Sequence, residues 1–234
     1  MAEIMENLII GCRTLENELT AALSRCKDSY EIVWLDARLH NVRKKLKNAV
    51  QEILDTASGF NHILLATGFC GNAIAGLEVR EIPLVIPRVD DCTSLLLGGY
   101  QNKLPWLDSY FLTEGWLKGN ANIWNEYQYS LKKYGKEQTA SIFSMMFANY
   151  RRLALLDTGC YDLNACMAQA RQIGEALSLN LTVVAASIQY LQLLLTGPWD
   201  SKRFLLLPPH ATLCPSDLSR IYQEDCESCQ TRKN

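Results

Sequence analysis

The sequence predicts an α/β protein with a largely parallel sheet flanked by helices, arranged as two α/β lobes with a cleft between them. Short, nearly continuous apolar runs alternate with segments of helical apolar spacing, which is typical of a parallel sheet covered on both faces. An aromatic-rich stretch interrupts this alternation at residues 100–130, and the alternation then resumes. The length of 234 residues suits one large domain or two small ones.

The first half contains four apolar runs that predict strands. These are residues 8–11, 32–35, 62–67 and 83–87. Apolar residues spaced three and four apart predict a helix after each strand. We expect Thr14 to cap the first helix and Asn41 to cap the second, which runs to Leu54. The third is a short helix that ends at Gly76, and the fourth begins at residues 90–93 and stops at Gly98.

The second half begins with a predicted strand at residues 110–113 and continues with two helices. The later elements are a strand at 153–157, a helix at 162–177, a strand at 181–184, a helix at 188–195 and a strand at 204–207. The two helices that follow the first strand are expected at 122–134 and 136–149. We therefore divide the chain into an N-terminal lobe at 1–109, a C-terminal lobe at 110–213 and a polar tail at 214–234. One continuous sheet is the alternative.

The composition excludes several classes of function. Hydrophobic residues make up 48% of the chain, and the net charge is −2, so no basic surface for nucleic acid is expected. The acidic start does not resemble a secretory leader, and no apolar run is long enough to span a membrane. We therefore expect a cytoplasmic protein. Its nine cysteines are then core thiols, metal ligands or redox groups rather than disulfides.

Three cysteines follow three predicted strands: Cys12, Cys70 and Cys92. Ligands of an open parallel sheet bind just outside the carboxyl ends of its strands, so we expect the three thiols to meet there. His40 follows the second strand and is a candidate fourth ligand, although a lone histidine is often a cap or a surface group. Three cysteines and a histidine suit zinc or an iron–sulfur cluster. Ordinary burial of free thiols is the alternative interpretation.

Residues near these thiols are candidates for contact with a cofactor or substrate. Gly71 and Asn72 follow Cys70, and Asp91 precedes Cys92. Asp157 ends a later strand, where a helix cap or turn is the alternative. Cys12 precedes an expected helix N-terminus, which predicts a lowered thiol pKa.

The remaining histidines are weaker candidates. His62 begins a strand at the opposite edge and is expected to be structural. His210 follows the last strand, and we expect it to reach the same edge as the cysteines.

The aromatic residues Tyr110, Trp116 and Trp124 either line a pocket or pack in the core. A pocket of such rings would suit a quaternary ammonium group or the face of a corrin. Cys226 and Cys229 form a single CxxC in the polar tail, which is either a loose pair of thiols or a peripheral metal clamp. Neither a glycine-rich phosphate loop nor a GxSxG nucleophile elbow is present.

Several longer motifs carry a resemblance to a known family. They are GFCGNAIAGL, IPLVIPRVDDCTSLLLG and YFLTEGW, then NYRRLALLDTG and the GPWDSKRFLLLPP region. On these motifs the chain resembles, over nearly its whole length, the family catalogued as domain of unknown function 1638. The resemblance implies an uncharacterised family of anaerobic bacteria and methanogenic archaea whose genes often neighbour those of corrinoid methyltransferases for methylamines or betaines. It also implies that Cys12, Cys70 and Cys92 match the family's motif cysteines, whereas the CxxC tail is outside the pattern.

The leading hypothesis is a metal-binding protein of anaerobic one-carbon or corrinoid metabolism, with methyl transfer at a metal thiolate centre as one mechanism. Zinc and an iron–sulfur cluster both remain open as the cofactor, and a role for a corrinoid is indirect. A corrinoid protein or methyltransferase is an expected partner, with a small molecule as substrate. The alternatives are a non-enzymatic accessory or chaperone protein for such a methyltransferase system, or a thiol redox protein. The sequence does not decide whether the chain is an enzyme.

Overall fold

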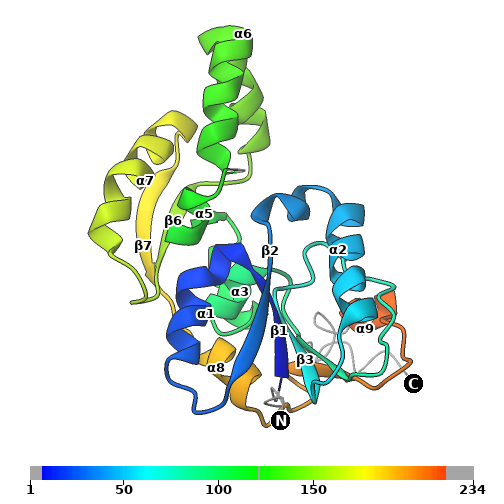
Figure 1. The fold of residues 1–234 in the computed structure, drawn as a ribbon. Helices are drawn as coiled ribbons and strands as arrows, with labels where there is room; N and C mark the ends of the chain where they lie inside the picture. Colours follow the sequence, from blue (N-terminus) through cyan, green and yellow to red (C-terminus); the bar gives the residue numbers. More distant parts are fainter. Residues whose placement is uncertain (1–6, 121, 220–234) are drawn as a thin grey trace, which may run out of the picture.

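The computed structural model describes residues 7–120 and 122–219, and the Cys226–Cys229 pair lies outside this part of the chain. The fold is α/β, with mostly parallel sheets flanked by helices (Figure 1). A five-stranded sheet has the order β2-β1-β3-β4-β8, and a three-stranded sheet has the order β5-β6-β7. The predicted fold class is confirmed.

The five-stranded sheet is parallel except at one edge. Its strands are β1 (Asn7–Cys12), β2 (Tyr30–Leu35), β3 (His62–Ala66), β4 (Leu84–Pro87) and β8 (Phe204–Leu207). The first four coincide with the apolar runs of the first half. β8 runs antiparallel to β4, with Leu207 opposite Leu84 and Phe204 opposite Pro87.

Helices cover both faces of this sheet. The helical segments that connect or follow its strands are η1 (Arg13–Leu15), α1 (Glu16–Leu23), η2 (Ala37–Asn41), α2 (Arg43–Thr56), α3 (Cys92–Leu96), α4 (Tyr100–Lys103), η3 (Leu104–Trp106), α8 (Gln189–Thr196) and α9 (Pro215–Ser219). Because side chains alternate along a strand, Ile9 faces the core under α1 and α8, and Ile10 faces the core under α2. The two faces are visible as α1 and α8 on one side of the strands and α2 on the other (Figure 1).

The three-stranded sheet is parallel throughout. Its strands are β5 (Ser109–Leu112), β6 (Arg152–Asp157) and β7 (Asn180–Ala185), and its helices are α5 (Glu114–Lys118), α6 (Ile123–Met146) and α7 (Leu163–Leu177). α6 contains a break at Gly135, where φ is 77°, so it consists of the two helices expected from the sequence. These two helices extend away from the rest of the molecule (Figure 1).

Three local expectations from the sequence were wrong. No helix forms at 70–76, because Cys70, Gly71 and Asn72 all have positive φ and the segment is a series of turns. Thr14 does not cap α1, because it lies within η1. Asn41 does not cap α2, because it lies within η2.

The end of the chain returns to the first sheet. After β7, helix α8 packs on α1 and α3, and β8 then pairs with β4. Residues 204–207 therefore belong to the five-stranded sheet, although we expected them in a C-terminal lobe at 110–213. The antiparallel direction of β8 carries His210 to the start of β4, where its Nε2 lies 3.6 Å from Glu81 Oε2. The expectation that His210 reaches the cysteines was wrong for this reason.

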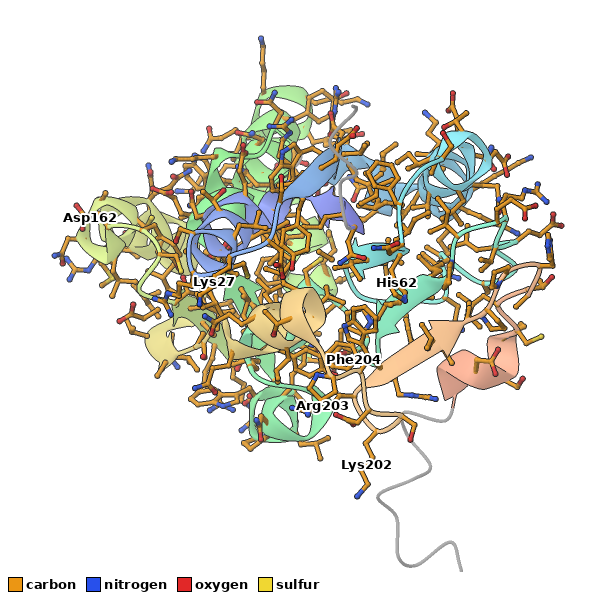
Figure 2. All side chains as sticks on the ribbon, turned by 60° about the horizontal axis from the view of Figure 1, so that its bottom comes forward. Lys27, His62, Asp162, Lys202, Arg203 and Phe204 are labelled. Carbon is orange, nitrogen blue, oxygen red and sulfur yellow. The ribbon has the colours of Figure 1, made fainter. Side chains whose placement is uncertain are left out.

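His62 also lies at the amino edge of the sheet, at the start of β3 (Figure 2). Its ring packs edge-on against Trp199 with a centroid distance of 4.7 Å. Burial lowers the pKa of His62, so this imidazole is more readily neutral than a solvated one.

The two sheets share an apolar core. One cluster of buried side chains contains Ile9 and Leu64 of the first sheet together with Ala154 and Leu156 of the second. Close packing at Gly115 adds a second contact, since a Cβ there would lie 2.2 Å from the Thr14 carbonyl oxygen. Glycine is thus required for α5 to approach η1, and this approach brings the second sheet beside the end of β1.

A buried carboxyl group also joins the two sheets. Glu18 on α1 is 0% exposed, and its Oε1 accepts a 3.0 Å hydrogen bond from Thr158 Oγ1, which follows β6. Its Oε2 is buried without a hydrogen-bond partner among the described residues. Burial is the main cause that raises the pKa of Glu18, and the hydrogen bond from Thr158 opposes this rise.

We predict that Glu18→Gln becomes more favourable relative to the wild type as pH rises. A carboxyl with a raised folded-state pKa contributes most below its unfolded pKa of about 4.3, and its contribution is lost as pH rises through the folded value. Glutamine keeps a hydrogen-bond acceptor for Thr158, and because it does not titrate, its contribution to stability does not fall as pH rises. Urea unfolding of both proteins at about pH 4 and about pH 8 measures the difference. An identical difference at the two pH values would contradict the buried, titrating carboxyl.

Within residues 7–120 and 122–219, none of the helices has both the length and the apolar character needed to cross a membrane.

Candidate metal centre and its cavity

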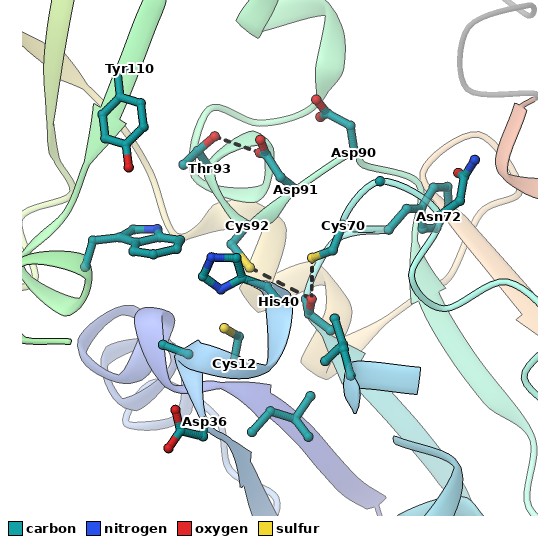
Figure 3. A pocket seen from close by; sticks show the side chains of 17 residues that line it. Cys12, Asp36, His40, Cys70, Asn72, Asp90, Asp91, Cys92, Thr93 and Tyr110 are labelled. Carbon is teal, nitrogen blue, oxygen red and sulfur yellow. Dashed lines mark hydrogen bonds between the residues drawn. The ribbon is translucent and has the colours of Figure 1, made fainter. Parts of the chain in front are cut away.

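A cavity of about 540 Å³ lies at the carboxyl ends of β1 to β4 (Figure 3). Each of these strands contributes to its wall through the residues that follow it, and β5 and α5 of the second sheet add Tyr110 and Trp116. The thiols line it together with His40. Its other lining residues are Leu35, Asp36, Ala37, Leu46, Thr67, Phe69, Gly71, Asn72, Asp90, Asp91 and Thr93. The sheet edge that the sequence indicated is therefore a real cavity.

The three strand-end thiols interact with one another through Cys92. Hydrogen bonding to Cys92 is the largest cause that raises the pKa of Cys12 and of Cys70, and burial raises both further. The pKa of Cys92 is held well below its ordinary value, first by the hydrogen bonds from Cys12 and Cys70, against an opposing effect of burial. The Gly68 backbone adds another hydrogen bond. The three thiols therefore titrate as a coupled group, in which Cys92 loses its proton more readily than Cys12 or Cys70.

The lowered pKa that we expected for Cys12 was therefore wrong. Cys12 precedes the short 3-10 helix η1 rather than the N-terminus of a longer α-helix. Its sulfur also lies beside Cys92, which carries the negative charge more readily. A hydrogen bond of 3.0 Å between Cys12 Sγ and Thr14 Oγ1 lowers the Cys12 pKa, but the effects of Cys92 and burial are larger.

Backbone pairing beyond the ends of β3 and β4 places Cys70 beside Cys92. Phe69 N donates to Val89 O at 3.0 Å, and Cys70 N donates to Asp90 O at 2.8 Å. Gly68 packs directly on this second segment, because a Cβ there would lie 2.3 Å from the Asp91 Cα.

The Thr67 hydroxyl lies between the sulfurs of Cys70 and Cys92. Its Oγ1 lies 3.6 Å from Cys70 Sγ and 3.9 Å from Cys92 Sγ (Figure 3).

A buried ion cluster fixes the segment that precedes Cys92. Lys103 is 8% exposed, and its Nζ lies 2.9 Å from Asp90 Oδ2 and 2.5 Å from Asp91 Oδ2. Asp91 also caps α3 by accepting a hydrogen bond from Ser94 N. Burial favours the neutral form of Asp91, but the charge and hydrogen bond of Lys103 outweigh it and keep the pKa below its usual value. Asp91 thus both caps α3 and lines the cavity.

His40 and Asp36 form the side of the cavity that follows β2. The His40 ring packs edge-on against Trp116 with a centroid distance of 4.7 Å. Asp36 caps η2, and its hydrogen bonds with Arg38 lower its pKa to about 2. Asp36 is therefore a carboxylate at neutral pH.

The described residues contain no group of three or more His, Cys, Asp or Glu side chains already arranged to hold a metal ion. Each of the three thiols is instead hydrogen-bonded to a threonine hydroxyl, Cys12 to Thr14 and both Cys70 and Cys92 to Thr67. A metal would have to replace the protons on Cys12 and Cys70, because thiolates are the ligands. It would also require the cysteine side chains to reorient around it.

The structure brings most of the predicted site residues together, with two exceptions. Gly71, Asn72, Asp91 and Trp116 line the cavity, although the Asn72 side chain points away from the sulfurs (Figure 3). Asp157 does not line the cavity. Its Oδ1 instead accepts a hydrogen bond from Gly159 N in a local turn.

Trp124 is the second exception. It stacks on Tyr127, packed against the core of the three-stranded sheet, and does not reach the cavity.

Sequence reasoning missed Asp36, Thr67 and Lys103. Asp36 and Thr67 follow strands β2 and β3 directly, so the strand-edge rule that selected the cysteines applies to them as well. Lys103 has no such signal, because it ends the short helix α4 and its ion pairs with Asp90 and Asp91 form only in the folded chain.

A family model described as "Protein of unknown function (DUF1638)" matches residues 34–195. The chain belongs to this family. The match includes His40, Cys70, Cys92 and Trp116, whereas Cys12 lies before it, so the match is shorter than the resemblance read from the motifs. No curated protein and no solved structure matches the chain.

We predict that Gly68→Ala destabilises the protein by about 1–3 kcal/mol or more, since the added methyl group overlaps the Asp91 backbone. Gly59→Ala is the matched control, because a Cβ at Gly59 has no atom within 4 Å and meets only the cost of a positive φ. Thermal or urea unfolding measures both variants. Equal losses in the two variants would show that the close packing beside Cys92 is absent.

Proposed function

We propose that this protein binds zinc or an iron–sulfur cluster through Cys12, Cys70 and Cys92, and acts in anaerobic one-carbon or corrinoid metabolism. The observation that carries the proposal is the position of three thiols, which lie at or just after the ends of three separate strands and line one cavity. Thiols scattered at random through an α/β core would not gather at the ligand-binding edge of the sheet.

The available donors fit a soft or borderline metal. Three thiolates with an imidazole are a common ligand set for zinc, and three cysteines can also hold an iron–sulfur cluster. His40 is the nitrogen donor that lines the same cavity. Thiolates suit such a metal better than they suit a hard cation, which prefers oxygen ligands.

When bound, zinc would supply a Lewis acid for a thiolate substrate in methyl transfer, and a cluster with three cysteine ligands would leave one iron open. Residues of the chain have separate tasks in this proposal. Cys92, at 8% exposure, would supply a thiolate ligand shielded from water. Gly68 and Thr67 hold the cysteine segments together, and Lys103 fixes the segment before Cys92.

A thiol redox protein is the second candidate, and the lowered pKa of Cys92 favours it. The titration of Cys92 is coupled to both other thiols, so its thiolate could attack oxidised glutathione and release one glutathione thiol. Attack of Cys12 or Cys70 on the mixed disulfide would then release the second glutathione and leave a disulfide bond to Cys92. An accessory protein for a corrinoid methyltransferase system is the third. It gains support from apolar side chains exposed on α6, including Met145 at 70% and Tyr129 at 61%.

We predict that Cys70→Ala lowers the metal content of anaerobically purified protein, because it removes one of three soft ligands. Cys166→Ala is the control, since Cys166 is a buried thiol of α7 outside the cavity. Elemental analysis with ultraviolet–visible spectra gives zinc, or iron with sulfide, per chain.

The outcomes separate the candidates. Stoichiometric metal that falls only in Cys70→Ala supports the metal centre. Equal metal content in both variants removes Cys70 from it. A metal-free protein that loses two thiols on treatment with oxidised glutathione favours the redox protein, and a metal-free protein with unreactive thiols favours the accessory role.

A further inference from the structure

The cavity is larger than a metal centre requires. Its volume of about 540 Å³ falls within the range of about 300–1,000 Å³ that is typical of pockets for small organic ligands. The thiols occupy the sheet edge, whereas Tyr110 and Trp116 come from the second sheet and form a different part of the wall. This leaves room beside the thiols for a molecule of several heavy atoms.

The wall of the cavity lacks positive charge. Among its described lining residues there is no lysine and no arginine, while three aspartates line it. Asp90 and Asp91 share Lys103, which leaves one negative charge in excess at that side. Asp36 is ionised and pairs with Arg38, whose side chain does not line the cavity. An anionic ligand would therefore meet carboxylates and thiols without a cation to receive it.

Aromatic and apolar groups make up much of the remaining wall. Trp116 and Tyr110 are half-buried, so part of each ring is open to a ligand, and Phe69, Leu35 and Leu46 add apolar surface. Burial raises the pKa of Tyr110 to about 12, so its phenol stays neutral. The Tyr110 hydroxyl points toward the cavity (Figure 3) and has no hydrogen bond among the described side chains. Rings combined with carboxylates suit a cation that carries apolar groups.

We propose that the cavity binds a small organic cation, an alkylated ammonium, with its methyl groups against Trp116 and Tyr110 and its charge compensated by Asp36 and the Asp90–Asp91 pair. This proposal deepens the proposed function by naming the substrate class of the same cavity. It rests on that function for the role of the ligand, but ligand binding itself depends on rings and carboxylates and not on a bound metal.

The test compares three probes of one shape by isothermal titration calorimetry. Choline is the cation, its analogue with carbon in place of nitrogen is the uncharged probe, and tert-butylacetate is the anion. We expect choline to bind about tenfold more tightly than the uncharged analogue, as a partly desolvated cation on aromatic rings should, and tert-butylacetate not to bind. The proposal is overturned if the uncharged analogue binds as tightly as choline. It is also overturned if tert-butylacetate binds or if choline does not bind.

Two variants with matched controls locate the bound probe. Trp116→Leu should weaken choline binding about tenfold, whereas Trp124→Leu, outside the cavity, should leave it unchanged. Asp36→Asn should weaken choline several-fold and leave the uncharged analogue unaffected, with Asp28→Asn as the control. Circular dichroism confirms that each variant is folded. Equal effects of a variant and its control would place the probe elsewhere and overturn the proposal.

A repeat of the titration on chelator-treated protein separates this inference from the metal centre. Choline binding in a protein that never contains metal supports the cation site and contradicts the metal proposal. If the protein as purified holds stoichiometric metal, and choline binds neither to it nor to the metal-depleted protein, the cation site is contradicted and the metal proposal stands.

Discussion

The contact of Cys92 with Cys12 and Cys70 is the constraint on which the candidate site depends. The three residues are far apart in the sequence and meet only because β1, β3 and β4 run parallel and end at one edge. Coupling among the three thiols lowers the pKa of Cys92, although this residue is only 8% exposed. Perturbed pKa values of this kind cluster at functional sites, which is why the proposed function is placed here.

The rest of the fold positions the wall around this cluster. Gly68 lets the segment with Cys70 pack on the backbone before Cys92, and Gly115 lets α5 approach η1. The contact at Gly68 sets the spacing of the Cys70 and Cys92 segments. The contact at Gly115 brings Trp116 into edge-on ring contact with His40. A shared apolar core between the two sheets then keeps the thiol side and the aromatic side of the cavity in place.

The sequence predicted most strands and helices because their apolar periodicity is local and strong. It also selected Cys12, Cys70, Cys92 and His40, since the ends of parallel strands converge. The turns at 70–76 were not predicted because three consecutive residues adopt positive φ, including the non-glycine residues Cys70 and Asn72. The pairing of β8 with β4 could not be predicted either, since an apolar run does not specify its partner strand or its direction.

Electrostatic properties were harder to predict than positions. The pKa of Cys12 depends on a sulfur eighty residues away in sequence, and the pKa of Asp91 depends on Lys103 at the end of α4. X-ray absorption spectroscopy at the edge of the bound metal shows directly whether Cys12, Cys70 and Cys92 are its ligands. We expect three sulfur ligands, at about 2.3 Å for zinc. A metal surrounded by oxygen and nitrogen alone would contradict it.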